Sequence, residues 1–228
     1  MTTSAYEEVP TAVVQAELAA RADRPTDVGG DALPFDHISG RRFEILTYLL
    51  RKTEVPAGDT VTLVKSTGDR GRDVLIYRHN QLAEIIQCKN QREAMTRPEL
   101  VRELMKLALH AFRDPTLLGS GKDAVAYSIW CTGGFTEPAG VLSDTWPEFW
   151  CENIVRGEFS EIKEQYSSLA PTEWDAIKTF LLHDFPAKIT LTKVDAIDLS
   201  ARIRAKPNVY NQFLVDLWLL HYPMSNRH

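Results

Sequence analysis

Three short runs rich in β-branched and other apolar residues follow one another between residues 61 and 89. The runs 61–65, 73–77 and 82–89 have the composition of strands and are bounded by Gly-containing or polar turns. Connections this short join strands that run in opposite directions. The spacing therefore predicts an antiparallel meander, and any fold for this chain has to be built around a sheet.

Helical periodicity is found on both sides of the meander. Apolar residues recur at helical spacing in residues 40–52, and again in 99–112, where Pro98 stands at the expected N-terminus. Residues 124–131 are almost uninterrupted apolar, as in a strand buried on both faces, and 136–142 can form a further helix. This order predicts an α/β fold, an αβββαβα sandwich with a mixed central sheet.

We expect three parts in the chain. Residues 1–37 form an N-terminal arm, peripheral or flexible, with a helix-compatible stretch at 11–22 followed by Gly and Pro residues. Residues 38–155 form the α/β core. Residues 156–228 form a mainly helical extension or connector. Helical patterns are found at 158–166, 172–183, 195–204 and 207–221, and 189–191 has the pattern of a short strand.

Composition narrows the class of protein further. None of the apolar runs approaches the roughly 18–20 residues that span a bilayer, and the first ten residues do not resemble a secretory signal. Cys88, Cys131 and Cys151 are three in number and widely spaced, which favours reduced thiols, the first two as buried small residues. We therefore expect a cytoplasmic protein without a membrane segment.

The net charge of −5 is unevenly distributed. Residues 41–106 hold 13 Lys and Arg against 9 Asp and Glu, whereas the rest of the chain holds 13 against 22. A basic segment inside an acidic protein points to a phosphate-bearing ligand. On charge alone, a normally mixed surface explains it equally well.

The most informative residues are Asp73, Gln87 and Lys89. Alternation along the third strand puts Gln87 and Lys89 on the same face as Ile85, and Asp73 begins the neighbouring strand. A polar Gln and a Lys that end an apolar strand on the same side are costly unless they face solvent or a site. Carboxylate and amide oxygens suit Mg²⁺, and a lysine can hold or deprotonate water and offset charge on a phosphate. An Asp in a turn and a Lys at a strand end are also common without any such role.

Five stretches, in order along residues 38–150, resemble one family of nucleases. They are Arg42-Phe43-Glu44, Gly71-Arg72-Asp73-Val74, Ile86-Gln87-Cys88-Lys89, Arg97-Pro98-Glu99-Leu100 and Thr132-Gly133-Gly134-Phe135-Thr136-Glu137-Pro138-Ala139. Together they are similar to the Mrr-type restriction endonuclease branch of the PD-(D/E)XK superfamily, which uses a Q-x-K variant of the motif.

The resemblance implies roles for individual residues. Asp73 becomes the principal metal ligand, Gln87 a ligand through its amide oxygen, and Cys88 a ligand through its carbonyl. Lys89 becomes the residue that positions water or stabilises the transition state. Glu44 is implied as an outer metal ligand or an orienter of the lysine, with a solvated helix glutamate as the equal alternative. The implied cofactor is Mg²⁺, for which Mn²⁺ can substitute, and a Gln in place of an acidic residue implies weaker metal binding.

Arginines flank these residues and can contact nucleic-acid phosphates, although each is individually as well explained as an ordinary surface residue. They are Arg70, Arg72, Arg92 and Arg97. The expected function is a metal-dependent endonuclease that cuts double-stranded DNA, with RNA not excluded, in restriction or antiphage defence. Cutting two strands implies a homo-oligomer, and related domains imply a regulatory NTPase or sensor as partner. The alternative is a nuclease-fold module that binds nucleic acid or a protein without cutting.

Overall fold

The computed structural model describes residues 7–20, 24–65, 70–119, 121, 123–165 and 171–216. A five-stranded sheet at the centre has the order β2-β3-β4-β5-β6. Its strands are β2 (Thr60–Leu63), β3 (Val74–Arg78), β4 (Gln81–Lys89), β5 (Val125–Cys131) and β6 (Ile189–Val194). The first three are antiparallel, whereas β5 and β6 run parallel to β4. The predicted meander and the mixed sheet are both confirmed.

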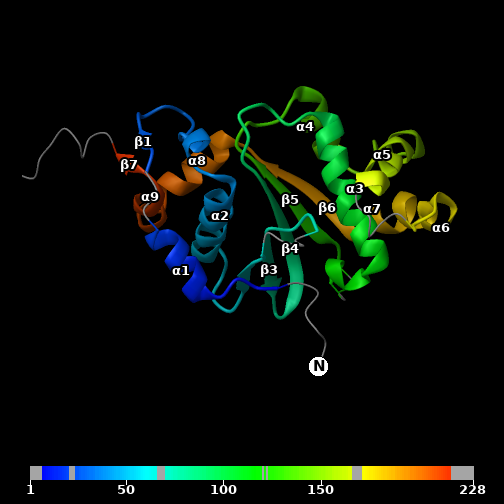
Figure 1. Cartoon of the computed structure of the whole chain (residues 1–228), viewed down its shortest axis with the longest axis horizontal. Helices are drawn as coiled ribbons and strands as arrows, with labels where there is room; N and C mark the ends of the chain where they lie inside the picture. Colours follow the sequence, from blue (N-terminus) through cyan, green and yellow to red (C-terminus); the bar gives the residue numbers. More distant parts are fainter. Residues whose placement is uncertain are drawn as a thin grey trace, which may run out of the picture.

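Helices cover the two faces of the sheet, so that the molecule has three layers (Figure 1). On one side lie α1 (Thr11–Ala19), α2 (Gly40–Glu54), α8 (Ala196–Arg204) and α9 (Pro207–Phe213). On the other lie α3 (Arg97–Arg113), α4 (Glu137–Asp144), α5 (Glu152–Gln165), α6 (Trp174–Thr179) and α7 (Phe185–Lys188). This is the α/β sandwich of the restriction-endonuclease-like fold. Of the helices described, none is long and apolar enough to cross a membrane.

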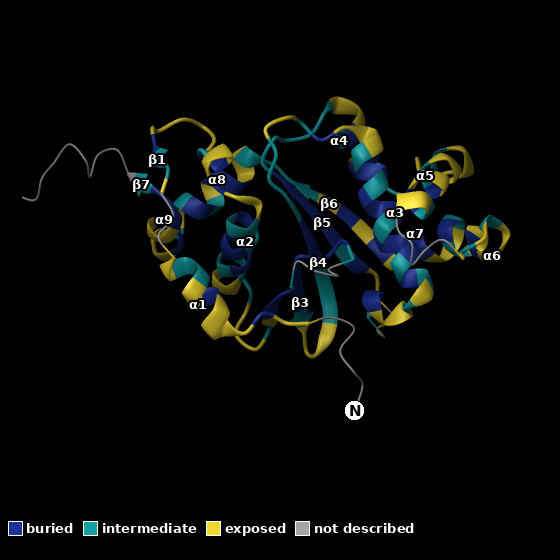
Figure 2. Ribbon diagram, in the orientation of Figure 1, coloured by how far each residue is buried: buried dark blue, intermediate teal, exposed yellow. Residues whose placement is uncertain are grey.

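Alternation along the strands divides the core into two clusters, one on each face. Ile85 packs with Leu75 and Tyr127 on the α3 side, while Ile86 and the partly buried Cys88 pack on the α2 side. Burial is deepest along the central strands and decreases toward the outer helices (Figure 2). The strand faces expected from the period of two are therefore correct.

Helix α3 begins where the sequence predicts. Thr96 and Glu99 form a capping box, in which the Thr96 amide donates to Glu99 Oε2 at 2.7 Å. Pro98 occupies the first turn, where its missing N–H is not needed. The helix buries Leu100, Leu104 and other apolar residues against the sheet, so that its start and its orientation are both well determined.

The segments outside the core motifs also contact the sheet. Val9 donates its amide to Leu63 O at 2.9 Å, which extends β2 at its end, and Val14 of α1 is buried. The short strands β1 (Thr26–Asp27) and β7 (Val215–Asp216) pair in parallel and bring two distant parts of the chain together. The described part of the arm is thus packed, although the sequence left it open whether the arm is peripheral or flexible.

The C-terminal part differs from the expectation in detail. The predicted strand near residue 189 exists as β6, and it adds to the main sheet beside β5. The predicted single helix 172–183 is instead α6 followed by a π-helical turn, Phe180–Asp184. The helix predicted for 207–221 ends at Phe213, and residues 217–221 lie outside the described residues.

Candidate active site

The register of β3 and β4 places Asp73 directly opposite Gln87. Val74 pairs with Ile86, and the Asp73 amide donates to Ile86 O at 2.9 Å, so the ladder continues one residue beyond the strand. Gln87 Nε2 donates to Asp73 Oδ2 at 2.7 Å, and the Cys88 amide donates to the same oxygen at 2.6 Å. Asp73 is 3% and Gln87 5% exposed, so both are polar groups held inside the protein.

The turn before Asp73 is held by Gly71 and Tyr127. Gly71 has a φ of +81°, which favours glycine, and the buried Tyr127 hydroxyl donates to Gly71 O at 3.2 Å. A Cβ at position 71 would lie 3.6 Å from Gln87 Oε1. The glycine of the Gly-x-Asp motif therefore bends the chain so that Asp73 enters the ladder beside the amide of Gln87.

The Gln87 amide lies among oxygen atoms that suit a hard cation. Its Nε2 donates to Asp73 Oδ2 and, at 3.4 Å, to the Cys88 carbonyl, so these two oxygens lie around the same nitrogen atom. Its Oε1 is buried and has no hydrogen-bond partner among the described residues. A buried acceptor without a partner costs about 1–3 kcal/mol, which a bound donor or cation would offset. These residues fit a divalent metal, because rotation of the amide turns Oε1 toward the two oxygens.

The described residues contain no group of three or more His, Cys, Asp and Glu side chains able to hold a metal ion. A site built from Asp73, the Gln87 amide and the Cys88 carbonyl has a single carboxylate and so differs from such a group. Mg²⁺ keeps several waters and needs few protein ligands, so this small set is adequate for it.

The Cys88 side chain points away from this set, toward the α2 face, where it packs with the core. Burial, followed by the negative charge of Asp73, raises the pKa of its thiol well above the usual range. The thiol therefore stays protonated, and only the carbonyl of Cys88 can serve as a ligand near neutral pH.

Lys89 lies at the end of β4 and forms an ion pair that the sequence interpretation missed. Its Nζ is 2.9 Å from Oε1 of Glu103, which is 7% exposed on α3. The other Glu103 oxygen lies 2.6 Å from Lys106 Nζ. A signal was present in the sequence, because Glu103 interrupts the apolar stripe of α3 between Leu100 and Leu107.

Glu44 belongs to α2, which covers the other face of the sheet from α3. Its Oε2 accepts from Arg41 Nη1 at 2.7 Å, and Arg41 also pairs with Glu17 of α1 at 2.9 Å. Glu44 still acts electrostatically on the Cys88 thiol, as Asp73 does. The structure thus brings Asp73 and Gln87 into contact, with Lys89 two residues beyond Gln87 in β4 and Glu44 on the helix layer opposite α3.

The loop after Lys89 is fixed by the turn that follows β5. The Thr132 amide donates to Lys89 O at 3.0 Å, and Thr132 Oγ1 accepts from the Gln91 amide at 2.9 Å. At Gly133 a Cβ would lie 2.0 Å from Glu93 O, so only glycine allows the two backbones to approach so closely. The Thr-Gly-Gly stretch therefore supports the strand end that carries the lysine.

The four flanking arginines differ in their placement. Arg92 and Arg97 are exposed, and Arg92 lies 3.6 Å from Asp36. Arg70 is partly exposed and pairs with Asp114 at 3.1 Å. Arg72 is only 1% exposed, so the alternative of an ordinary solvated surface arginine is wrong for this residue. Its contact with phosphate stays a prediction.

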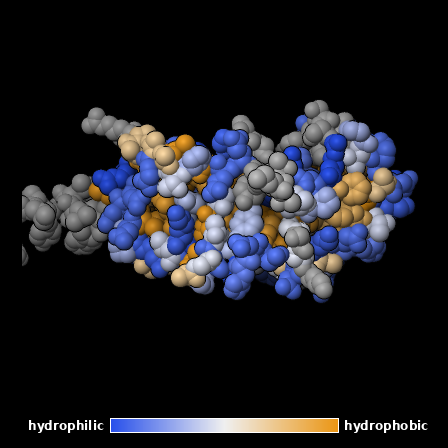
Figure 3. Space-filling view, turned by 90° about the horizontal axis from the view of Figure 1, so that it is seen from below, coloured by the Kyte–Doolittle hydropathy of each residue, from blue (hydrophilic) through white to orange (hydrophobic). Residues whose placement is uncertain are grey.

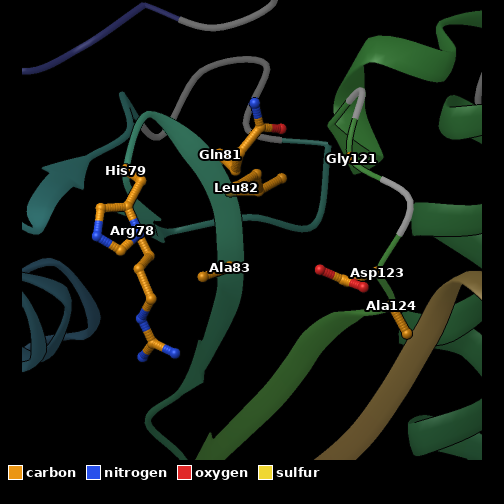
Figure 4. Close-up of a pocket in the computed structure, with 8 residues that line it drawn as sticks. All are labelled: Arg78, His79, Gln81, Leu82, Ala83, Gly121, Asp123 and Ala124. Atoms are coloured by element: carbon orange, nitrogen blue, oxygen red, sulfur yellow. The ribbon is translucent and has the colours of Figure 1, made fainter.

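An open groove of about 550 Å³ lies at the other end of the sheet. Figure 4 shows Arg78 and His79 of the β3–β4 hairpin on one side and Asp123, just before β5, on the other. Ala83 in this groove precedes Gln87 by four residues, or about 13 Å along the strand. The groove is thus separate from the Asp73 cluster.

Figure 3 shows the molecule turned by 90° from Figure 1, so that it is seen from below. This face is largely hydrophilic, with hydrophobic areas recessed between polar residues.

A mixed sheet between two helical layers, with Asp73 in contact with Gln87 near the end of β4, has the architecture of the restriction-endonuclease-like class. Residues 35–145 match the Mrr catalytic domain family (Mrr_cat), described as restriction endonuclease, and this part of the chain belongs to that Mrr-type family. Comparison with curated proteins and with solved structures found no match. The domain is therefore a restriction endonuclease-type nuclease, and enzymes of this family typically use a divalent metal.

Proposed function

We propose that the chain is a Mg²⁺-dependent endonuclease whose centre is formed by Asp73, Gln87 and Lys89. The observation that supports it best is the buried contact of Gln87 Nε2 with Asp73 Oδ2 at 2.7 Å, together with the unpartnered Gln87 Oε1 beside it. Buried polar groups of this kind are retained where a ligand completes their interactions.

The roles follow from the chemistry of each group. Asp73, the amide oxygen of Gln87 and the carbonyl of Cys88 would hold the metal, with Glu44 as an outer ligand. When bound, Mg²⁺ would polarise the scissile phosphate and lower the pKa of a coordinated water. Lys89 contributes a positive charge and three donors, with which it orients water and stabilises charge that develops on the phosphate. Mn²⁺ should support the same chemistry.

We further propose double-stranded DNA as the substrate, with Arg70, Arg92 and Arg97 contacting its phosphates. Cutting both strands requires two centres, so we propose a homo-oligomer. A role in restriction or antiphage defence, under a regulatory NTPase or sensor, rests on the resemblance of the domain alone. The division into an arm (1–37), a core (38–155) and an extension (156–228) stays a proposal of the same kind.

The test is a cleavage assay on double-stranded DNA, single-stranded DNA and RNA, with Mg²⁺, Mn²⁺ or EDTA. We expect cleavage of double-stranded DNA that requires the metal, and a loss of about 100- to 1000-fold or more in Asp73→Ala and Lys89→Ala. Cleavage that persists in EDTA or in both variants would refute the proposed centre. Preference for RNA would keep the centre and change the substrate.

One observation favours a second candidate, a module that binds nucleic acid without cutting it. Gln87 brings no negative charge, and its Nε2 donates to the two oxygens that the metal would need. Tight DNA binding without cleavage in any divalent metal would support this alternative. Calorimetric titration with Mn²⁺ separates the two, because the enzyme should bind the metal and Asp73→Ala should not.

A further inference from the structure

We propose that Glu103 is the positioning residue of Lys89, and that it fixes where the side-chain nitrogen of this lysine lies. The inference rests on the proposed function, because it assigns the group that places Lys89 for its role there. It starts from a carboxylate on α3 that neither the motifs nor the metal ligand set includes.

Glu103 is a buried carboxylate that contacts two lysines, one through each oxygen. One carboxylate oxygen lies 2.9 Å from Lys89 Nζ and the other 2.6 Å from Lys106 Nζ. The Glu103 side chain is 9% exposed, whereas those of Lys89 and Lys106 are 24% and 17% exposed. A carboxylate is retained in such a place only when charged partners compensate for its loss of water.

The position of Glu103 along α3 explains how it reaches the site. Helix α3 packs on the sheet face that carries Gln87, and the Leu107 amide lies 3.9 Å from the place of a Cβ on Gly71. Glu103 precedes Leu107 by one helical turn and so lies on the same face. The capping box at Thr96 fixes where the helix starts, and the carboxylate is thereby held at a set position under the end of β4.

Position then decides what Lys89 can contact. Its Nζ is held by Glu103 at 2.9 Å on one side. Its remaining donors can make hydrogen bonds to a phosphate oxygen or to the attacking water. The pair of Lys89 and Glu103 alone is neutral, and Lys106 restores a net positive charge to the group. The three residues together present one positive charge to an incoming phosphate.

The first experiment is a double-mutant cycle on DNA cleavage with Glu103→Gln and Lys89→Ala. We expect kcat to fall about 10- to 100-fold in Glu103→Gln, as for residues that orient a ligand, with KM for DNA changed less than about two-fold. In the Lys89→Ala background, Glu103→Gln should cause no further loss, because it acts through the lysine.

Glu158→Gln is the matched control. Glu158 is also a mostly buried carboxylate, it lies on α5, and it pairs with Arg102 of α3 at 3.4 Å. Its substitution removes a mostly buried charge that pairs with the same helix, α3, but on the side that faces α5, and should leave cleavage unchanged. Equal losses in Glu158→Gln and Glu103→Gln, or additive losses in the cycle, would show a structural effect and overturn the inference.

The second experiment does not depend on activity or on the metal. Amine-reactive labelling followed by mass spectrometry measures how fast Lys89 is modified, with Lys178, 49% exposed on α6, as reference. We expect the rate at Lys89 to rise several-fold in Glu103→Gln while that at Lys178 is unchanged. An unchanged rate at Lys89 overturns the inference. If the wild-type chain cuts no substrate, the proposed function fails, whereas labelling still decides the role of Glu103.

Discussion

The two ends of strand β4 differ in a way that bears on how active sites are found. The hairpin end borders a groove of about 550 Å³ whose lining residues are mostly exposed to solvent. The other end has Asp73, Gln87 and Glu103 almost fully buried, each held by named partners. A groove can form on a protein surface at little energetic cost, whereas buried polar groups need interactions that compensate for their loss of water. Buried polar groups are therefore the better guide to the candidate active site in this protein.

The largest expected effect compares the two ends directly. Asp73→Asn should reduce metal-dependent DNA cleavage by about 100-fold or more, because it removes the carboxylate that contacts Gln87 in the proposed ligand set. Asp123→Asn, at the exposed groove, should change cleavage less than about two-fold. Measured rates with Mg²⁺ check both variants. A strong loss in Asp123→Asn alone would reverse our assignment of the two ends.

A second comparison separates buried charge with a structural role from buried charge at the site. Glu54 pairs with Arg202 and Arg51, and Arg202 also stacks 4.3 Å from the Trp130 ring centre. Burial alone would raise the pKa of Glu54, but the hydrogen bonds from Arg202 and Arg51 outweigh it and lower the pKa below 4.5. In this network both carboxylate oxygens of Glu54 accept hydrogen bonds from arginines, whereas Gln87 Oε1 has no partner among the described residues.

Glu54→Gln should therefore lower the free energy of unfolding by about 1.5–3 kcal/mol at pH 7 and leave the chemistry of any folded enzyme intact. Because the folded-state pKa is depressed, the stabilisation is full above about 4.5 and is lost as the pH falls through the folded value. Chemical denaturation at pH 7 and at acid pH should show the two proteins converging. A constant difference would contradict the origin of the effect.

Gly133, which lies against the loop that follows Lys89, provides a third test. Gly133→Ala puts a Cβ 2.0 Å from Glu93 O, and because both groups are backbone, the loop after Lys89 must move. We expect the free energy of unfolding, measured by thermal denaturation, to fall by about 1–3 kcal/mol, and the rate of DNA cleavage to fall as well. Gly157→Ala, on α5 with nothing within 4 Å, should instead stabilise the protein by about 0.5–1 kcal/mol.

The smallest expected effect concerns the Gly71 turn. Tyr127→Phe removes the hydroxyl that donates to Gly71 O and should cost about 1 kcal/mol of unfolding free energy. Cleavage should fall modestly, because Asp73 follows this turn. Wild-type cleavage together with wild-type stability would show that the turn is held without the tyrosine.

The sequence predicted where the candidate residues lie when local pattern determines it. The period of two and the short hairpin bring Asp73 into contact with Gln87, and the capping signal locates α3. Glu103 interrupts the apolar stripe of α3, but its contact with Lys89 depends on how α3 packs across β4 and was therefore missed. The burial of Arg72 was not predicted, since a charged residue in a polar turn gives no sign of it. The π-helical turn after α6 likewise depends on tertiary packing.

The enclosed Cys88 thiol has a practical consequence. Cys88 and the buried Cys131 both have a raised pKa, caused first by burial, whereas Cys151 is exposed at the start of α5. Maleimide dyes or spin labels should therefore attach at Cys151 and spare the cleavage centre. The unmodified chain thus offers a natural anchor for a reporter with which DNA engagement can be followed in real time.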